Sequence, residues 1–439
     1  MAKKKSKKKN SKPAQPSVRL SQCMIVKNEE KNIEKALGWA KNITCEQIIV
    51  DTGSTDRTVE MAEQMGAKVY SFEWINDFSA AKNHAIEQAK GNWIAFLDAD
   101  EYFTQEDSRK LMTTLRQIQS DREGMGKTSA LVSPWVQLDD NNSVFAIHQQ
   151  CRIFRNRPDI RYQGRIHESP SVGDEILFVP ELSIMHTGYS KAETDEKGKA
   201  LLKAKILREE LATAPDDPNL MVYLASAISV PPSTDENLAE ADSLNRAALE
   251  AKSGLHPHLR QKAYNALLDD YVSKPEMIDD FERYCTRALN DFPGDLDFTY
   301  YRGTLLNKQG EYKAALEVLK QCEAMLLGTA DLSISYVVQA KPALLFLEMA
   351  EATQALDDKE GTVQCMTIAL QLDENNLIIL SRYLIVMKEY GASDNELISL
   401  LGNMYDYDSA GDLALLLRAA GAAGDEALFN VIKSMTGDN

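Results

Sequence analysis

The sequence predicts a two-part protein, in which an α/β domain with a mostly parallel sheet precedes an all-α domain of helical repeats. Two observations carry this prediction. Up to about residue 100, short apolar runs alternate with stretches of helical periodicity, as in parallel α/β sheets. After about residue 190 the pattern is helical throughout. We therefore expect one domain at residues 18–190 and a second at residues 191–439, preceded by an arm at residues 1–17.

Apolar runs predict the strands of the first domain. The first four are Leu20–Val26, Gln47–Val50, Lys68–Tyr70 and Trp93–Leu97. The segments between them place apolar residues at helical spacing, and the last of these helices is expected at Phe78–Ala89. Further strands are expected at Ser129–Leu138, Val144–Ile147, Arg152–Phe154 and Leu182–Met185. Because ligands bind beyond the carboxyl ends of parallel strands, we expect functional residues directly after the first runs.

The helical part contains degenerate repeats. One copy is clear and runs through Gly303, Gly310, Tyr312, Ala315, Leu319 and Cys322. Its spacing resembles the tetratricopeptide repeat (TPR), and Ala288 with Pro293 matches the end of a preceding copy about 34 residues earlier. Each such unit is a helix pair that buries its apolar face only by stacking on its neighbours. We therefore expect a TPR-like domain, with a plain helical bundle as the alternative.

The N-terminal arm is rich in lysine. The first twelve residues hold seven lysines and no acidic residue, and Pro13 and Pro16 follow. Such a segment cannot bury a core, so we expect it to be disordered. A solubilising tail is the simplest interpretation, and contact with an anionic surface is the alternative.

Composition excludes several classes of function. The net charge is −17 and is more negative still outside the arm, which argues against nucleic acid as the main partner. No run of about 18 apolar residues predicts a transmembrane helix, and the N-terminus lacks the apolar segment of a secretory signal. Six scattered cysteines without a C-x-x-C pair indicate a reducing compartment. We expect a cytoplasmic protein.

Two carboxylates follow the fourth apolar run. Asp98 and Asp100 stand two positions apart, directly after Trp93–Leu97. Carboxylate oxygens are preferred ligands of hard divalent cations, and a cation held in this way usually carries a substrate diphosphate. A D-x-D triplet alone is common in surface turns, so its interpretation depends on the motifs around it.

Several motifs accompany the two carboxylates. They are Cys23–Glu30, Val50–Thr58, Asp77–Asn83, Phe96–Glu101, Arg152–Asn156, Tyr162–Glu168 and His186–Tyr189. In this order and spacing they closely resemble the family 2 glycosyltransferases, which have the nucleotide-diphospho-sugar fold called GT-A. The resemblance covers roughly the first 190 residues, and the co-occurrence of several motifs makes it specific.

The order of the domains adds to the resemblance. A short glycosyltransferase domain followed by TPR helices resembles bacterial enzymes that glycosylate peptides and proteins, including sublancin-type S-glycosyltransferases and flagellin glycosyltransferases. It implies an inverting, metal-dependent transfer of a hexosyl or N-acetylhexosaminyl group from a nucleotide-diphosphate sugar, UDP-linked, to a Ser, Thr or Cys side chain held by the TPR-like domain. A glycan or lipopolysaccharide-core acceptor and a non-catalytic TPR scaffold are the alternatives. Exposed helical faces favour a homodimer.

The resemblance assigns residues to the donor. It implies that Asp51 contacts the nucleobase, whereas an Asx-turn is the alternative. Lys82 neutralises phosphate, with a solvated lysine as the alternative; the family more often has arginine here, whose bidentate fork lysine lacks. Asp100 ligates the divalent cation, Mn²⁺ or Mg²⁺. Asp98 is a further candidate ligand of the metal, and it contacts the ribose or a metal-bound water.

The remaining assignments concern the proton and the third metal ligand. An inverting transfer needs a group that takes the acceptor proton. We expect Glu168 to be this base, with His167 as its rival and an ion pair of Glu168 with Arg165 or Arg161 as the structural alternative. His186 is the candidate third metal ligand, because many GT-A enzymes take a histidine from the end of the domain. A structural histidine is the alternative.

Overall fold

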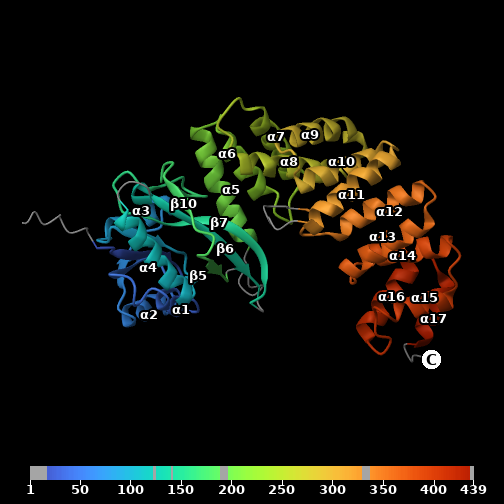
Figure 1. The fold of residues 1–439 in the computed structure, drawn as a ribbon, viewed down its shortest axis with the longest axis horizontal. Coiled ribbons are helices and arrows are strands. Elements are labelled where there is room, and N and C mark those ends of the chain that lie inside the picture. The colour runs from blue at the N-terminus through green and yellow to red at the C-terminus, as the bar shows by residue number, and fades with distance from the viewer. Residues whose placement is uncertain (1–16, 122–124, 140–141, 188–195, 329–336, 436–439) are drawn as a thin grey trace, which may run out of the picture. The chain divides into compact units, whose positions relative to one another are not determined.

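The computed structural model describes residues 17–121, 125–139, 142–187, 196–328 and 337–435 (Figure 1). The chain divides into two units, residues 1–215 with 230–232, and residues 216–229 with 233–439. The first unit is α/β and the second is helical, as predicted. The lysine-rich arm, apart from Ser17, and the predicted boundary at residue 190 lie outside the described residues, so both stay predictions.

The first unit contains a mixed, mostly parallel sheet. In the described part of the chain, nine strands join it in the order β3-β2-β1-β4-β7-β6-β11-β5, and β10 pairs with β6. β7 is antiparallel to both β4 and β6, and β5 is antiparallel to β11; the other pairs are parallel. The strands are β1 (Leu20–Val26), β2 (Glu46–Asp51), β3 (Lys68–Ser71), β4 (Trp93–Phe96), β5 (Glu101–Phe103), β6 (Ala130–Leu138), β7 (Val144–Arg155), β10 (Ile176–Phe178) and β11 (Ile184–His186).

Helices cover both faces of the parallel part of the sheet. Successive residues of a strand point to opposite faces, so β1 sends Cys23 into one apolar cluster and Met24 into another. The first cluster includes Ala85, and the second includes Leu37. This two-sided burial explains why β1, β2 and β4 read as continuous apolar runs. The helices of this part are α1 (Ile33–Gly38), α2 (Thr58–Gln64), α3 (Phe78–Glu87) and α4 (Gln105–Ser120).

Two strand predictions needed correction. The runs predicted at Val144–Ile147 and Arg152–Phe154 belong to one strand, β7, because β7 pairs with β6 over nearly its whole length, including the polar residues between the two runs. The last strand begins at Ile184 rather than Leu182, and it ends at His186. Backbone pairing with a neighbouring strand, which apolar patterning does not report, decided both limits.

Local structure fixes the elements that carry the candidate residues. Asp77 caps α3, because its carboxylate accepts the backbone N–H of Ala80 at 2.8 Å, and this cap places Lys82 in the second turn. In the sheet, β11 pairs antiparallel with β5, and His186 stands opposite Glu101. This register brings the end of β11 to the segment that follows β4.

The second unit is a succession of helices that pack on their neighbours (Figure 1). One large apolar core runs from α6 to α17, and a smaller cluster of Leu306, Ala315 and Ala352 joins α10, α11 and α12. The helices are α6 (Pro218–Ile228), α7 (Asp235–Glu250), α8 (Pro257–Tyr271), α9 (Ile278–Asp291), α10 (Leu296–Lys308), α11 (Tyr312–Gly328), α12 (Ala343–Ala355), α13 (Lys359–Leu372), α14 (Leu377–Glu389), α15 (Asp394–Leu401), α16 (Ala410–Ala422) and α17 (Glu426–Met435). Among the described helices, none is both long and apolar enough to cross a membrane.

The predicted repeat copy forms the helix pair α10–α11. Gly303 lies where the two helices approach closely, since a Cβ atom there would stand 2.4 Å from Cδ2 of Leu319. Gly310 lies in the turn between them with φ +77°, a conformation that favours glycine. Ala315 and Cys322 are buried on the same side of α11 as Leu319. The stacked helix pairs confirm a TPR-like unit.

Helix α5 (Glu196–Thr213) belongs to the first unit, although it follows the predicted boundary. It buries Ala204, Ile206 and Leu207, and the Glu210 carboxylate accepts the backbone N–H of Arg165 at 3.0 Å. The residues 230–232 also return to this unit. The first unit therefore extends beyond the segment that carries the recognised motifs.

We expect Gly91→Ala to destabilise the first unit. A Cβ at Gly91 would stand 2.6 Å from the carbonyl oxygen of Arg19 and 2.8 Å from the backbone nitrogen of Ser21, and backbone atoms cannot move aside cheaply. Overpacking of this kind costs about 1–3 kcal/mol. Urea unfolding followed by tryptophan fluorescence measures the effect on this unit alone, because all four tryptophans precede residue 136. Gly38→Ala is the control, since nothing lies within 4 Å of its Cβ position; an equal loss in both variants would contradict the assignment.

Candidate active site

A cleft of about 850 Å³ lies at the carboxyl ends of β1, β2 and β4. It is lined by five of the seven residues predicted from the sequence, namely Lys82, Asp98, Asp100, Glu168 and His186. Its size is within the range of small-molecule sites, and its position is where open α/β sheets bind ligands. Predicted residues that lie far apart in the sequence therefore share one cavity of the first unit.

Lys82 is buried in the wall of this cleft. Its Nζ atom lies 2.8 Å from Oε1 of Glu168 and 3.2 Å from Oδ1 of Asp98, and its side chain is only 2% exposed. Burial opposes its charge, but the two carboxylates outweigh burial and raise the pKa of Lys82 above its ordinary value. The solvated-lysine alternative is therefore wrong.

Arg152 is the functional residue that sequence reasoning left without a role. It comes from β7, donates from Nε and Nη2 to Glu101, and donates from Nη2 to Oδ2 of Asp98 at 2.8 Å. Glu101 is 1% exposed, and it also accepts the backbone N–H of Asp98 at 3.0 Å. The antiparallel pairing of β7 with β4 aligns Ile153 with Ala95 and so brings Arg152 to the end of β4. The sequence signals were its place at the start of a predicted strand and in the motif Arg152–Asn156, to which no role had been assigned.

Asp98 lies between these two cations. One carboxylate oxygen contacts Lys82 and the other contacts Arg152. Burial acts to raise the pKa of Asp98, but Lys82 and Arg152 outweigh it and hold that pKa well below its usual range. Asp98 is therefore ionised at neutral pH. Its predicted contact with ribose or with a metal-bound water stays a prediction.

Asp100 and His186 form a second pair that lines the cleft. Nε2 of His186 lies 3.2 Å from Oδ2 of Asp100, and Nδ1 lies 2.7 Å from Oε1 of Gln137. If Nδ1 carries the proton and donates it to Gln137, the Nε2 lone pair can bind a cation, the arrangement typical of metal-ligating histidines. The indole ring of Trp135 packs on the imidazole with ring centroids 4.5 Å apart.

This pair suits a cation that arrives with a diphosphate. No group of three His, Cys, Asp or Glu side chains able to hold a metal occurs in the part of the chain that the structure describes. Mg²⁺ is usually held by one or two carboxylates together with substrate phosphates and waters, rather than by an all-protein cage. Asp100 and His186 therefore fit a divalent cation with an open coordination shell. Direct ligation by Asp98 stays a prediction.

Asp51 adopts the turn that was considered as its alternative role. Its carboxylate accepts the backbone N–H groups of Gly53 and Ser54, each at 3.1 Å. It lies at the carboxyl end of β2 and next to Thr52, a lining residue of the cleft, but it does not itself line the cleft. A carboxylate has further lone pairs, so the turn is compatible with a nucleobase contact. That contact stays a prediction.

Glu168 and His167 are placed differently. Glu168 lines the cleft and pairs with Lys82, whereas Arg165 pairs with Glu209 and Arg161 donates to backbone carbonyl groups. The expected alternative, an ion pair with either arginine, is therefore not formed. His167 is exposed, has φ 54°, and is not among the lining residues. The geometry favours Glu168 over His167 as the base, and the role itself stays a prediction.

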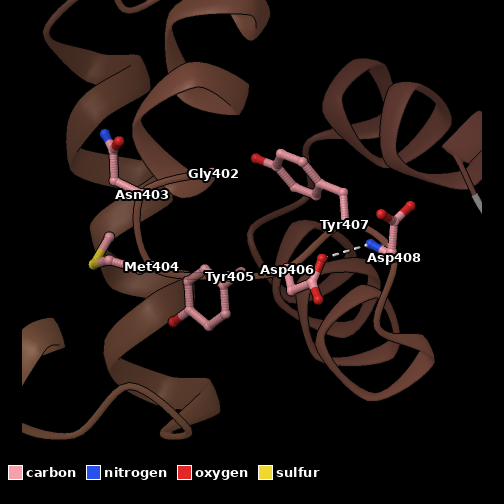
Figure 2. A pocket seen from close by; sticks show the side chains of 7 residues that line it. All are labelled: Gly402, Asn403, Met404, Tyr405, Asp406, Tyr407 and Asp408. Atoms are coloured by element: carbon pink, nitrogen blue, oxygen red, sulfur yellow. Dashed lines mark hydrogen bonds between the residues drawn. The ribbon is translucent and has the colours of Figure 1, made fainter.

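A hollow in the second unit does not compete with this cleft. Figure 2 shows it around residues 402–408, a single segment between α15 and α16. The hydroxyl of Tyr405 donates to the carbonyl of Glu374 at 2.6 Å, and that of Tyr407 donates to the carbonyl of Ile398 at 2.5 Å. The carboxylate of Asp406 accepts the backbone N–H of Asp408. These polar groups fold the loop, and none of the seven lining residues is cationic.

We expect Arg152→Met to destabilise the first unit strongly. Removing the guanidinium leaves the buried Glu101 without its charged partner, and breaking a buried ion pair in this way costs about 3–5 kcal/mol. The measurement is urea unfolding followed by tryptophan fluorescence. Arg157→Met is the matched control, because the Arg157–Asp159 pair is exposed and exposed pairs contribute little. Similar losses of unfolding free energy in the two variants would show that the ion pairs of Arg152 with Glu101 and Asp98 do not stabilise the site.

Comparisons with known proteins agree with this geometry. Residues 21–122 match the family model described as glycosyl transferase family 2. A TPR repeat-containing protein of Synechococcus elongatus is 34% identical over 221 residues, which are 48% of this chain and 51% of that protein. The SPbeta prophage-derived glycosyltransferase SunS of Bacillus subtilis is 28% identical over 288 residues, which are 64% of this chain and 65% of that protein.

The chain thus spans between half and two thirds of the length of these curated relatives. Among solved structures, Staphylococcus aureus TarS is similar at a TM-score of 0.36 and 17% identity, over 61% of this chain and 54% of TarS. That likeness is too distant to carry an argument. The sheet, the cleft at its carboxyl edge and the family match show that the chain carries a glycosyltransferase family 2 domain of GT-A type in its N-terminal part, followed by a TPR-like helical domain.

Proposed function

We propose that this protein is an inverting, metal-dependent glycosyltransferase that moves a sugar from a UDP-linked nucleotide sugar to a Ser, Thr or Cys side chain of a peptide or protein. One observation carries the proposal: in a family 2 domain, a single cleft is lined by Asp98, by an Asp100–His186 pair and by the carboxylate of Glu168. The pair suits a cation with a diphosphate, and the carboxylate of Glu168 suits a proton acceptor.

The donor side is formed by the ends of β2, β4 and β11. Asp100 and His186 would hold Mn²⁺ or Mg²⁺, which offsets the negative charge that develops on the departing diphosphate. Asp51, at the end of β2, is proposed to accept from the nucleobase. Lys27 and Lys203 also line the cleft and supply positive charge next to the phosphates.

The acceptor side is formed by Glu168. Its carboxylate is proposed to take the proton of the acceptor hydroxyl or thiol while the acceptor atom bonds to the anomeric carbon of the sugar. The bond from that carbon to the diphosphate oxygen breaks at the same time, and the diphosphate leaves with the electron pair. Attack from the face opposite the leaving group inverts the configuration at the anomeric carbon.

The TPR-like unit is proposed to hold the acceptor. Stacked helix pairs form extended surfaces suited to peptides and partner proteins. The glycosyltransferase SunS matches over 288 residues, more than the first unit contains, so the likeness continues into the helical region. A soluble glycan or lipopolysaccharide-core acceptor is the second candidate, because related enzymes share the same motifs.

A cytoplasmic location and a homodimer are further parts of the proposal. The structure holds all six cysteines as free thiols, and Cys23, Cys285, Cys322 and Cys365 are buried. Burial raises the pKa of Cys23, Cys285 and Cys322, so these thiols resist ionisation and oxidation. Free thiols favour a reducing compartment. The dimer is supported only by the exposed apolar residues of the helical unit.

We expect Asp100→Ala to abolish sugar transfer and metal-dependent donor binding without unfolding the protein. Its side chain lines the cleft and belongs to no apolar cluster, so its loss removes a cation ligand and little packing. The measurement is the thermal shift produced by UDP-sugars with Mn²⁺, followed by transfer or donor hydrolysis for the sugar that binds. EDTA should suppress the wild-type shift, and Mn²⁺ should restore it.

Asp159→Ala, an exposed carboxylate outside the cleft, is the control. Wild-type transfer by Asp100→Ala at saturating Mn²⁺ would rule out the metal assignment.

We expect Glu168→Gln to lower turnover by about 10²–10⁴-fold, because the amide keeps the shape of the side chain but cannot take a proton. Donor affinity should remain close to that of the wild type. Steady-state kinetics with the donor identified above measures both quantities. His167→Ala is the companion variant and should retain activity, since His167 does not line the cleft. The reverse outcome, an inactive His167→Ala and an active Glu168→Gln, would transfer the role to His167.

A further inference from the structure

We propose that one face of α3 is a positioning platform for the catalytic base, and that Lys82 acts in it as a positioning residue rather than as a ligand of the donor phosphates. This inference rests on the proposed function for the role of Glu168. A set of contacts from α3 to the segment 162–168 carries the inference. This segment consists of β8 (Tyr162–Gln163) and the turn that leads to β9 (Ser169–Pro170).

Four residues on one face of α3 hold this segment. The backbone N–H of Phe78 donates to the carbonyl of Arg165 at 2.9 Å, and the hydroxyl of Ser79 donates to the carbonyl of Gly164 at 2.5 Å. One turn later, Lys82 contacts Glu168, and the amide of Asn83 bonds both the N–H and the carbonyl of Tyr162, each at 2.9 Å. Positions three or four residues apart share one side of a helix, and this spacing relates residue 82 to residues 78 and 79, and residue 83 to residue 79. The motif Asp77–Asn83 is therefore accounted for by contacts within the protein.

The segment that carries Glu168 needs such an anchor. It contains two residues with positive φ, Gly164 at 85° and His167 at 54°, so it forms neither helix nor strand between β8 and β9. Near the start of the segment, the backbone carbonyl of Gly164 accepts a hydrogen bond from α3. At its end, the side chain of Glu168 forms an ion pair with Lys82 of α3. Among the residues that the structure describes, Lys82 is the only cation that forms an ion pair with the Glu168 carboxylate.

The surroundings of Lys82 leave little capacity for a phosphate. An ammonium group has three N–H donors, and two of them face Asp98 and Glu168. The group also lies over the rings of Phe96 and Tyr162, at 5.3 and 5.1 Å from their centroids. Although Lys82 lines the cleft, its side chain is only 2% exposed. A phosphate would therefore have at most one N–H donor of this group, on a side chain whose charge two carboxylates already balance.

The platform is itself held by the rest of the network. Asp98, the second partner of Lys82, is bound by Arg152, and Arg152 is bound by the buried Glu101. The position of Lys82 is therefore fixed from the end of β4, where the proposed donor site lies. This series of ion pairs fixes the position of the proposed base relative to the proposed donor site.

The test compares Lys82→Met with Glu168→Gln in the full-length protein. For Lys82→Met we expect turnover to fall about 10²-fold, the effect of a base misplaced by about 1 Å, while the dissociation constant for the UDP-sugar and Mn²⁺ stays close to the wild-type value. Because the two residues act as one unit, Lys82→Met should cost almost nothing further in the Glu168→Gln background. Lys82→Arg keeps a cation at this place and should recover part of the lost turnover.

Two outcomes would overturn the inference. A loss of donor affinity in Lys82→Met, or losses that multiply in the double variant, would show that Lys82 binds the donor phosphates. Normal turnover in Lys82→Met beside an inactive Glu168→Gln would show that the base needs no lysine. If Glu168→Gln itself is fully active, the proposed function fails at the base, and this result is separate from either of the others.

Ser79→Ala provides a second variant that does not alter a buried charge. It removes the hydrogen bond to the carbonyl of Gly164 and so loosens the segment that carries Glu168. Turnover should therefore fall, while donor affinity and the urea midpoint of unfolding stay unchanged. Ser108→Ala is the matched control, since its hydroxyl also donates to a backbone carbonyl, that of Thr104 at 2.8 Å, but on α4. If Lys82→Met does not fold, this pair decides the question: equal turnover in the two serine variants would rule out the platform.

Discussion

The candidate site depends on a chain of alternating charges formed by Glu168, Lys82, Asp98, Arg152 and Glu101. Both cations and Glu101 are largely withdrawn from water, and an isolated charge in such a place would be prohibitively costly. Each charge is tolerated because its neighbours carry the opposite sign. Asp98 is the centre of the chain, and its side chain, 37% exposed, opens to the cleft.

The five residues of this network come from separate parts of the first unit. They lie on α3, at the end of β4, on β5, on β7 and between β8 and β9. A buried ion network contributes little net stability compared with apolar residues of the same shape. Its physical effect here is geometric, because it ties the segment that bears Glu168 to the strand end that bears Asp98 and Asp100. The proposed donor and acceptor sides of the cleft are thereby connected by these ion pairs.

The first unit also includes chain that follows the recognised motifs. Helix α5 buries Ala204, Ile206 and Leu207 against it, and Ala200, Leu202 and Lys203 line the cleft. Val230 lines the cleft as well. The cavity is therefore completed by residues from the start of the helical region. In the second unit, the close approach at Gly303 and the continuous apolar core reflect stacking of helix pairs.

The sequence by itself determined the fold class and the repeats, because apolar periodicity reports burial. It also predicted functional residues directly after the first strands, because parallel strands end at one edge of a sheet. Asp98 and Asp100 could be found in this way, whereas Glu168 and His186 were predicted from the resemblance to the family 2 glycosyltransferases. Only the tertiary structure decided their partners. Arg152 reaches Asp98 through the antiparallel register of β7 with β4, and Lys82 meets Glu168 across a long sequence separation. Such contacts depend on strand pairing and helix placement, which local sequence patterns do not encode.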